Sequence, residues 1–330
     1  MEAEVRAELC FPLLLNSSCR KPTPHWSEAV ILNTLLSFVS VLTVTLNLLV
    51  IIAVSHFRQL HTPTNILLLS LAVSDYLVGL LLVPLEIFRQ TSCWVFGDLM
   101  CSLFIDFSVA VTNVSIGGMV LISVDRYVAI CDPLRYSSRI TERRVTVCVC
   151  LCWFLSFLYS NLLLMDDLVE PGRYRLCYGE CVIVVTFIAG VFDLVVTFVA
   201  PITAIIVLYM RVFVVAVSQA RALRSQVVTA VTLKSSMTVR AKKSELKAAR
   251  TLGVLVVVFV ICFCPYYIIS LVDENVLNAS YLSFLIFLFY FNSCINPLIY
   301  ALFYPWFRKS LKLIVTLRIL QPGSCETNIL

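Results

Sequence analysis

Long apolar runs separated by short polar segments make up most of this chain. A helix that crosses a bilayer needs about 20 consecutive, mostly apolar residues. Windows of this kind occur seven times, at about 28–56, 64–89, 98–131, 143–165, 183–217, 245–272 and 281–304. The pattern therefore predicts an all-α membrane protein, a bundle of seven transmembrane helices without a second, soluble domain.

The placement of charges predicts the orientation of these helices. Lysine and arginine are concentrated after the first, third, fifth and seventh spans, as in RITERR, RAKKSELKAAR and WFRKSLK. Because basic loops stay in the cytoplasm, we expect those ends inside and the N-terminus outside. The start, MEAEVRAELC, lacks the basic and apolar regions of a cleaved signal peptide, so the first span is expected to direct insertion.

Composition agrees with a membrane protein. Of the 330 residues, 60% are hydrophobic and only 14% are charged, whereas soluble domains have about a quarter charged residues. The net charge of +5 reflects membrane orientation, and no nucleic-acid partner is expected.

The two ends of the chain differ from the spans in their patterns. The sequence YPWFRKSLKLIVTL separates apolar from basic positions on a helix, which favours a helix lying on the inner membrane surface. Its apolar side would hold Trp306, Phe307, Leu311, Ile314 and Leu317. The expected organisation is an extracellular N-terminus (1–27), the seven-helix domain (28–304), an amphipathic eighth helix (305–320) and a cytoplasmic tail (321–330). The tail and the loop at about 218–244 are polar and are expected to be flexible.

Two sequons and several cysteines lie on the expected outer side. Asn16 and Asn278 each stand in an N-x-S sequon and are expected to carry glycans. An oxidising exterior favours disulfides among the outer cysteines, which are Cys10, Cys19, Cys101, Cys177 and Cys181. Cys93, near the same surface, could stay free.

A polar cluster is expected halfway across the bundle. An ionisable residue at the centre of a span costs roughly 2.5 to 3.5 kcal/mol on insertion scales, so it needs a partner or a purpose. Asp75, in the second span, is expected to lie near other polar residues, namely Asn47, Ser115, Asn292, Ser293 and Asn296. Their oxygens could hold a sodium ion, or they could only join the helices by hydrogen bonds. Both interpretations stay open, and no other metal and no cofactor is expected.

A pair of opposite charges marks the inner end of the third span. Asp125 and Arg126 are neighbours in SVDRYVAICDP, and Glu245 at the start of the sixth span could meet Arg126 across the bundle. Such a pair could hold the sixth span inward and break to give a second state, or it could be an ordinary interfacial ion pair. Pro201, Pro265 and Pro297 each remove a backbone hydrogen bond inside a span and so predict kinks. A last acid, Asp193, interrupts the apolar run GVFDLVVTFVAP of the fifth span.

These features, in order and at matching spacing, resemble the rhodopsin-like G-protein-coupled receptors. The matching positions are Asn47, Asp75, Asp125-Arg126-Tyr127, Trp153, Pro201, Tyr209, Phe259, Pro265 and Asn296-Pro297-Leu298-Ile299-Tyr300. Within that family, NSCINPLIYALFYPWF is similar to the fingerprint of the trace amine-associated receptors, and HTPTN, ICDPLRY, KAARTLG and CYGEC agree with it. The resemblance covers about residues 10–320 and implies a multi-pass receptor of the plasma membrane rather than an enzyme.

The chain departs from the family at two positions. Amine receptors usually place an aspartate seven residues after the outer cysteine of helix three, and here that position is Ser108. Asp106 is no substitute, because two residues of helix turn it to another face. Phe263 stands where most members have tryptophan above the helix-six kink, which leaves the detail of the activation trigger open.

The resemblance implies that the acid on helix five replaces the missing one, as in fish members of the family. Asp193 lies eight residues, or roughly 12 Å, outward of Pro201, at the depth of a ligand pocket. The alternative is an aspartate that only hydrogen-bonds to neighbours such as Thr197. The remaining expected pocket residues are Ser108, Val109, Thr112, Phe263, Tyr266, Tyr267 and Tyr290. Glu86 could be a second cation site, which would favour a diamine, or it could simply pair with Arg89.

The resemblance also implies disulfides and a signalling route. It implies a Cys101–Cys181 bond and a bond from Cys177 to an N-terminal cysteine, for which we prefer Cys19 over Cys10. Arg126 would face a heterotrimeric G protein of the stimulatory or olfactory type, with Tyr209 and Tyr300 bracing the open form.

Two other functions stay open. A class A receptor for a lipid or peptide is one, because Ser108 removes the usual amine anchor. A proton-coupled transporter is the other, because an intramembrane acid also suits a proton path. The odd number of spans and the lack of inverted repeats argue against a transporter.

Overall fold

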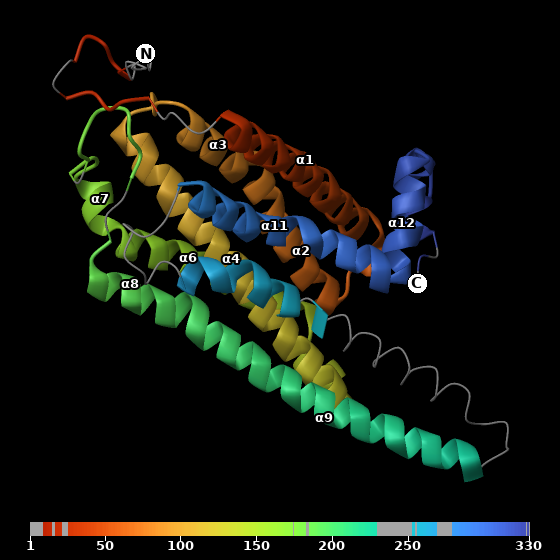
Figure 1. Cartoon of the computed structure of the whole chain (residues 1–330). Helices are drawn as coiled ribbons and strands as arrows, with labels where there is room; N and C mark the ends of the chain where they lie inside the picture. The colour runs from red at the N-terminus through yellow and green to blue at the C-terminus, as the bar shows by residue number, and fades with distance from the viewer. Residues whose placement is uncertain are drawn as a thin grey trace.

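The apolar runs of the sequence form long helices that lie side by side in one bundle (Figure 1). The computed structural model describes residues 9–14, 17–21, 26–173, 175–182, 185–229, 253–254, 256–268, 279–327 and 329. The long helices are α1 (Trp26–His56), α2 (Pro63–Leu77) continued by η2 (Val78–Leu82) and α3 (Val83–Thr91), α4 (Asp98–Cys131), α6 (Glu142–Leu163), α8 (Phe187–Asp193) continued by η3 (Leu194–Val199) and α9 (Ala200–Thr229), and α11 (Ala279–Phe303). The short helices are η1 (Arg58–Leu60), α5 (Pro133–Arg139), α7 (Met165–Val169), α12 (Pro305–Val315), η5 (Arg318–Leu320) and η6 (Ser324–Glu326).

Six helices are long and apolar enough to cross a bilayer, counting only the described residues. The expected span at 245–272 is described at 253–254 and 256–268, where Val256–Ile268 is an apolar helix. In the fifth span the helix continues to Thr229, well beyond the expected end at 217. The first part of the loop that we expected to be flexible is therefore helical, and α9 extends beyond the neighbouring helices in Figure 1.

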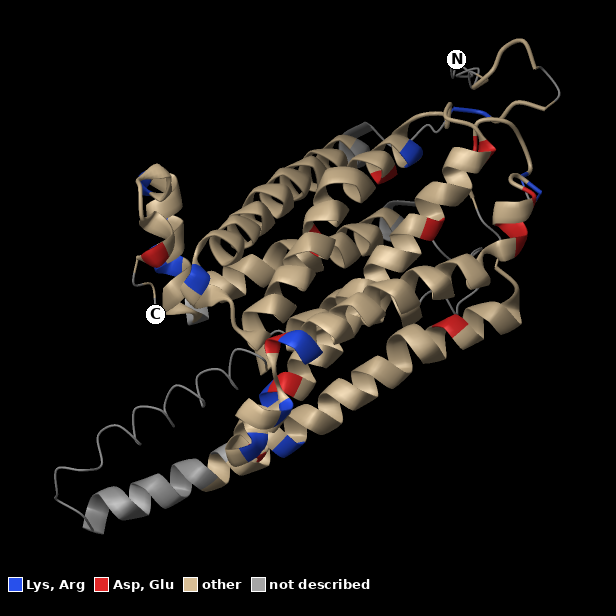
Figure 2. Cartoon of the chain, turned by 180° about the vertical axis from the view of Figure 1, so that it is seen from behind, with Lys and Arg blue, Asp and Glu red and all other residues tan. Residues whose placement is uncertain are grey.

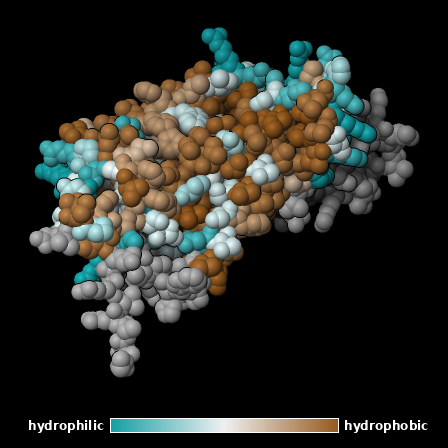
Figure 3. Space-filling view, turned by 90° about the horizontal axis from the view of Figure 1, so that it is seen from above, coloured by the Kyte–Doolittle hydropathy of each residue, from teal (hydrophilic) through white to brown (hydrophobic). Residues whose placement is uncertain are grey.

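The sides of the bundle are apolar, and its charges lie mainly at the two ends. Phe38, Phe154 and Leu162 are each about 60% exposed, which suits contact with lipid rather than water. Figure 3 shows a broad hydrophobic belt with hydrophilic residues toward the ends of the molecule. Figure 2 shows lysine and arginine gathered mainly toward the end that we expect to be cytoplasmic, here called the inner end, with few acids along the helices.

Threonines begin three of the helices. Thr62 accepts a hydrogen bond from the Asn65 backbone N–H at the start of α2, and Pro63 follows it at the first helical position. Thr141 and Thr186 cap α6 and α8 in the same way. Each cap satisfies a backbone donor that has no partner within its helix, so these residues fix where the spans start.

Two long helices contain a π-helical turn just before a proline. These turns are η2, followed by Pro84, and η3, followed by Pro201. A proline ring collides with the carbonyl four residues earlier, which lies inside the wider turn in both cases. The π-helical turn relieves that collision and also re-aims the side chains beside it. Asp193 immediately precedes η3, so this turn affects the direction of the acid.

The inner end differs from the sequence prediction in two respects. The eighth helix, α12, ends at Val315 rather than near 320, because Leu317 adopts a left-handed conformation with φ 57°. Leu317 is 67% exposed and does not extend the buried face formed by Trp306 and Phe307.

The tail is packed, in contrast to the expected flexible segment. Ile329 is 1% exposed, and its backbone N–H donates to Gln59 Oε1 at 3.1 Å. The Ser324 hydroxyl lies 3.0 Å from His56 Nε2 at the end of α1. The buried Ile329 and these polar contacts together hold the tail against the end of α1 and the turn after it.

Candidate ligand-binding and signalling sites

Asp193 is the last residue of α8 and points toward α6. The hydroxyl of Tyr159, on α6, donates a hydrogen bond of 2.9 Å to Asp193 Oδ1. The Thr197 hydroxyl donates to the backbone oxygen of Asp193 instead, at 2.7 Å. The Asp193 side chain is half-buried, and among the described residues no lysine, arginine or histidine forms an ion pair with it. Within that part of the chain, its charge is therefore not balanced.

Thr197 links this acid to the sixth span. Its hydroxyl oxygen lies 3.3 Å from the hydroxyl oxygen of Tyr267. Because the Thr197 proton is already given to Asp193, Tyr267 is the donor in this contact. Phe198, on the same turn, stacks on the Tyr267 ring with 4.4 Å between centroids. A movement of Asp193 can thus be passed to the sixth span through a single residue, Thr197.

The aromatic residues expected on one face of the sixth span do form one cluster. Tyr266 meets Tyr267 at 5.6 Å and Phe289 at 5.2 Å between ring centroids. Phe263 meets Phe289 at 4.6 Å and stacks on Phe259 at 4.5 Å. This cluster packs the sixth span against α11, as residues at i, i+3 and i+4 on a helix should.

The expected helix-three wall lies on α4. Ser108, Val109 and Thr112 are all half-buried, and the Ser108 side chain lies near the buried Tyr290 of α11. Tyr266 lies within electrostatic range of Asp193. The structure thus places Ser108 near Tyr290, and it links Thr197 and, through Thr197, Tyr267 to Asp193.

Glu86 is paired within its own helix. Arg89 donates to both of its oxygens, at 2.9 and 2.7 Å, and Gln90 donates a third bond at 2.8 Å. Arg89 also donates to the backbone oxygen of Cys181. Glu86 is 4% exposed, and its charge is balanced without a ligand. This geometry favours the interpretation in which Glu86 simply pairs with Arg89, rather than the one in which it is a second cation site.

Asp106 lies on a different contact surface of α4 from Ser108 and pairs with α6. It is buried between α4 and α6, where the Ser160 hydroxyl donates to it at 2.7 Å and Asn161 donates at 3.4 Å. This acid joins two helices and does not replace the aspartate missing at Ser108.

The structure brings the polar residues around Asp75 together. Asn296 donates to Asp75 Oδ2 at 2.8 Å, and Asn47 donates to the backbone oxygen of Ser293 at 3.0 Å. Ser115 donates to Ser74, the neighbour of Asp75, at 2.9 Å. Within this cluster, three buried oxygens have no partner among the described groups, namely Asp75 Oδ1, Asn47 Oδ1 and Asn292 Oδ1. One carboxylate and two amide oxygens are ligands that a hard cation such as sodium accepts.

Arg126 is held by its neighbour and by a residue of α2. It forms an ion pair with Asp125 at 2.5 Å and also donates to the Thr64 hydroxyl. Thr64 and Tyr136 each donate to Asp125 at 2.9 Å, so three groups hold this carboxylate. Burial raises the pKa of Tyr136 above its usual value near 10, so its hydroxyl stays protonated and donates at neutral pH. Glu245, the other expected partner of Arg126, lies outside the described residues, as do Asn16 and Asn278.

The other expected signalling residues lie along the inner half of the bundle. A Cβ placed on Gly253 would lie 2.0 Å from the Tyr209 hydroxyl, so only glycine lets Tyr209 approach the sixth span this closely. Tyr300 is fully buried one turn beyond Pro297, and its hydroxyl has no partner within the described part of the chain. Tyr127 is half-buried against Val212 of α9.

Three disulfides hold the outer surface. The structure contains Cys101–Cys181 and Cys19–Cys177, the two pairs implied by the family resemblance. It also contains Cys10–Cys93, so the expectation that Cys93 stays free was wrong. The N-terminal segment folds back through a Cys10 N–H to Cys19 oxygen bond and a bridge from Ser18 to Tyr178, which brings Cys10 near the α3–α4 loop.

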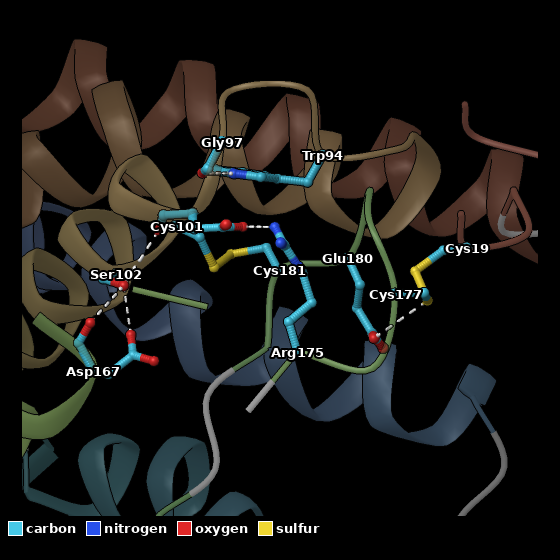
Figure 4. A network of polar contacts seen from close by, with 11 residues as sticks. Cys19, Trp94, Gly97, Cys101, Ser102, Asp167, Arg175, Cys177, Glu180 and Cys181 are labelled. Carbon is cyan, nitrogen blue, oxygen red and sulfur yellow. Dashed lines mark hydrogen bonds and ion pairs between the residues drawn. A yellow bond between two sulfur atoms is a disulfide. The ribbon is translucent and has the colours of Figure 1, made fainter. Parts of the chain in front are cut away.

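Polar contacts surround the Cys101–Cys181 and Cys19–Cys177 disulfides, as Figure 4 shows. Arg175 pairs with Asp98 and lies 4.0 Å from the centre of the Tyr178 ring. Ser102 donates to Asp167 at 2.5 Å, which ties the start of α4 to α7. The outer loop is therefore fixed over the ends of the helices rather than loosely attached.

The comparison with protein families identifies the class of this molecule. Residues 46–300 match the family described as the 7 transmembrane receptor (rhodopsin family). The chain therefore belongs to the rhodopsin family of seven-transmembrane receptors, which are receptors and not enzymes. The predicted all-α, seven-helix fold is confirmed.

Individual relatives narrow the family further. Trace amine-associated receptor 13c of Danio rerio is 39% identical over 98% of this chain and 96% of its own length. Trace amine-associated receptor 7e of Rattus norvegicus is 39% identical, and 7f of Mus musculus is 38% identical, each over 98% of this chain and 92% of the relative. The chain belongs to the trace amine-associated receptors.

Sequence reasoning missed two partners that the structure supplies. Tyr159 lies in the fourth span among residues that read as lipid-facing, and only its hydroxyl distinguishes it from Phe154 or Phe157. Tyr136 lies on the short helix α5 that follows α4, where the sequence gives no sign that it reaches Asp125. A tyrosine in either place would be worth testing as a partner for a nearby acid.

Proposed function

We propose that the chain is a G-protein-coupled receptor for small monoamines, with Asp193 as the counterion of the ligand ammonium. One observation carries the proposal: a half-buried carboxylate in an apolar helix receives a tyrosine hydrogen bond but no cation from the described residues. Lipid-embedded acids are costly unless they have a partner or a function. A ligand cation would supply the missing charge.

The expected gain is large enough to select amines. An ammonium about 4 Å from a carboxylate gains on the order of 4 kcal/mol at an effective dielectric constant of 20, before desolvation costs. A neutral molecule of the same shape gains none of this. Two tyrosines of the sixth span, Tyr266 and Tyr267, could add a cation–π contact from their ring faces.

The charges of the site suit a monoamine ligand better than a diamine. A diamine needs a second acid at a distance from Asp193, and Glu86 was the candidate. Two hydrogen bonds from Arg89 already balance that charge, and breaking a mostly buried pair of this kind leaves a charge without a partner.

Activation would follow from the link between the site and helix six. A ligand that binds Asp193 also affects Thr197 and, through Thr197, Tyr267. If the ligand binds the outward position of helix six more tightly, the population shifts toward that state. Arg126, released from Asp125, would then face a G protein of the stimulatory or olfactory type. Tyr209 and Tyr300 would support the open form.

The remaining features fit the same receptor. The N-terminus, with Asn16, and the segment containing Asn278 would lie outside the plasma membrane and carry glycans. The cluster at Asp75 would hold an allosteric sodium ion that favours the resting state.

Cells with a cAMP reporter provide the test. The wild-type chain is compared with Asp193→Asn and Glu86→Gln on alkyl and aryl monoamines, on diamines, and on alcohols of matching shape. Surface expression is measured for each variant. We expect amine responses that Asp193→Asn removes and Glu86→Gln leaves in place. Equal loss in both variants would indicate a diamine site.

The rival functions predict different outcomes. Responses to alcohols as strong as those to amines would indicate a receptor for a neutral ligand. Proton-driven amine uptake without a cAMP response would indicate a transporter.

A further inference from the structure

We propose that Tyr159 is the positioning residue of the amine site: its hydroxyl holds the Asp193 carboxylate in place and keeps it charged for the ligand. The inference rests on the proposed function, because it concerns the acid that would pair with the amine.

The contact joins two helices that are far apart in sequence. Tyr159 is on α6, Asp193 ends α8, and the hydroxyl oxygen lies 2.9 Å from Asp193 Oδ1. The Tyr159 ring also lies near the ring of Phe192, with 6.4 Å between centroids and 30° between planes. The residue next to the acid thus supports the ring that carries the hydroxyl. A hydrogen bond to an ionised acceptor is stronger than a neutral one and favours one direction of approach.

Asp193 needs an orienting partner because of where it lies. It precedes the π-helical turn η3, where side-chain directions depart from those of a regular helix. Its neighbours Phe192 and Leu194 are apolar and offer no donor. A hydrogen bond donated to a carboxylate favours the charged form. With Oδ1 held by Tyr159, the second oxygen is left to meet an ammonium.

The adjacent residue provides a natural comparison. Ser160 donates to Asp106 at 2.7 Å, and that bond joins α6 to α4 without touching Asp193. Two successive hydroxyls of α6 therefore each hold an acid, but only the Tyr159 bond involves the acid of the amine site. A general role in packing helices predicts similar effects from both, whereas positioning predicts an effect on amine potency from Tyr159 alone.

The test compares Tyr159→Phe with Ser160→Ala in the full chain. Both variants lose one hydroxyl, and the cAMP response to the monoamines that activate the wild type is measured at matched surface expression. Losing a hydrogen bond to a charged group should raise the EC50 of Tyr159→Phe by roughly tenfold or more, with an unchanged maximal response. Ser160→Ala should keep the wild-type EC50.

A double-mutant comparison separates positioning from general support. In an Asp193→Asn background, Tyr159→Phe should produce no further shift, because the charge that it orients is gone. Equal shifts in both backgrounds, or equal shifts from Tyr159→Phe and Ser160→Ala, would overturn the proposal. If Asp193→Asn gives no response at all, the comparison of the two single variants decides. Wild-type potency in Asp193→Asn would instead refute the proposed function, so the two failures are distinguishable.

Discussion

Replacing Asp125 by asparagine should make the receptor active without a ligand. Asp125 is 2% exposed and holds the Arg126 side chain, which is 15% exposed, through contacts of 2.5 and 2.9 Å. Water therefore screens this pair little. The substitution keeps the shape of the side chain and its acceptor oxygen for Tyr136. What it removes is the charge that restrains Arg126.

The magnitude follows from the type of contact. Hydrogen bonds to charged groups contribute about 1.5 to 3 kcal/mol, and 1.4 kcal/mol changes an equilibrium tenfold. A shift of about 2 kcal/mol would raise an active population from roughly 1 in 100 to roughly 1 in 4, if the pair exists only in the resting state. Ligand-independent cAMP should rise by on the order of tenfold.

The assay needs a control substitution, in which another aspartate at the inner end is replaced in the same way. Asp132 pairs with Arg139 at 3.6 Å, and both side chains are at least a third exposed. Exposed pairs contribute little, so Asp132→Asn should leave basal cAMP unchanged. Basal cAMP is measured in both variants at equal surface density. A basal signal in Asp125→Asn that equals the wild type would refute the view that this pair restrains the resting state.

Further predictions concern the sodium cluster, the outer surface and the tail. Physiological sodium in place of potassium should weaken amine binding by the wild type several-fold, and Asp75→Asn should abolish that difference; a sodium effect that persists in Asp75→Asn would place the ion elsewhere. The Cys10→Ser/Cys93→Ser variant should lose roughly 2 to 4 kcal/mol of stability, seen as a lower thermal midpoint in detergent, because this disulfide closes a long loop; an unchanged midpoint would mean that the other two disulfides suffice. Ile329→Asp should speed hydrogen exchange at the inner end of α1, because a charge cannot occupy that buried position; unchanged exchange would show that the tail does not protect it.

The sequence predicted the features that depend on long patterns. Six of the seven apolar windows correspond to helices whose ends agree with the prediction within a few residues, apart from the inner end of α9. Apolar content and length determine such spans, and both can be read directly. The two family disulfides were predictable because Cys101, Cys177 and Cys181 belong to a family pattern.

Contacts made by single side chains were harder to predict. The bond between Tyr159 and Asp193 joins two spans 34 residues apart, and nothing in either span signals the other. Ile329 looks unremarkable in a polar tail, and only the fold shows the apolar position that it fills. Cys93 was misjudged because its partner Cys10 approaches only after the N-terminus folds back over the outer loops.

Equilibrium binding to membranes tests the role of Asp193 most directly. The affinity of the most potent monoamine and of its alcohol isostere is measured for the wild type and for Asp193→Asn at equal receptor density. We expect the wild type to bind the amine roughly a hundredfold more tightly than the alcohol, a ratio smaller than the full charge interaction would give. In Asp193→Asn the two affinities should be equal. An amine preference of the same size in Asp193→Asn would show that the ammonium binds elsewhere.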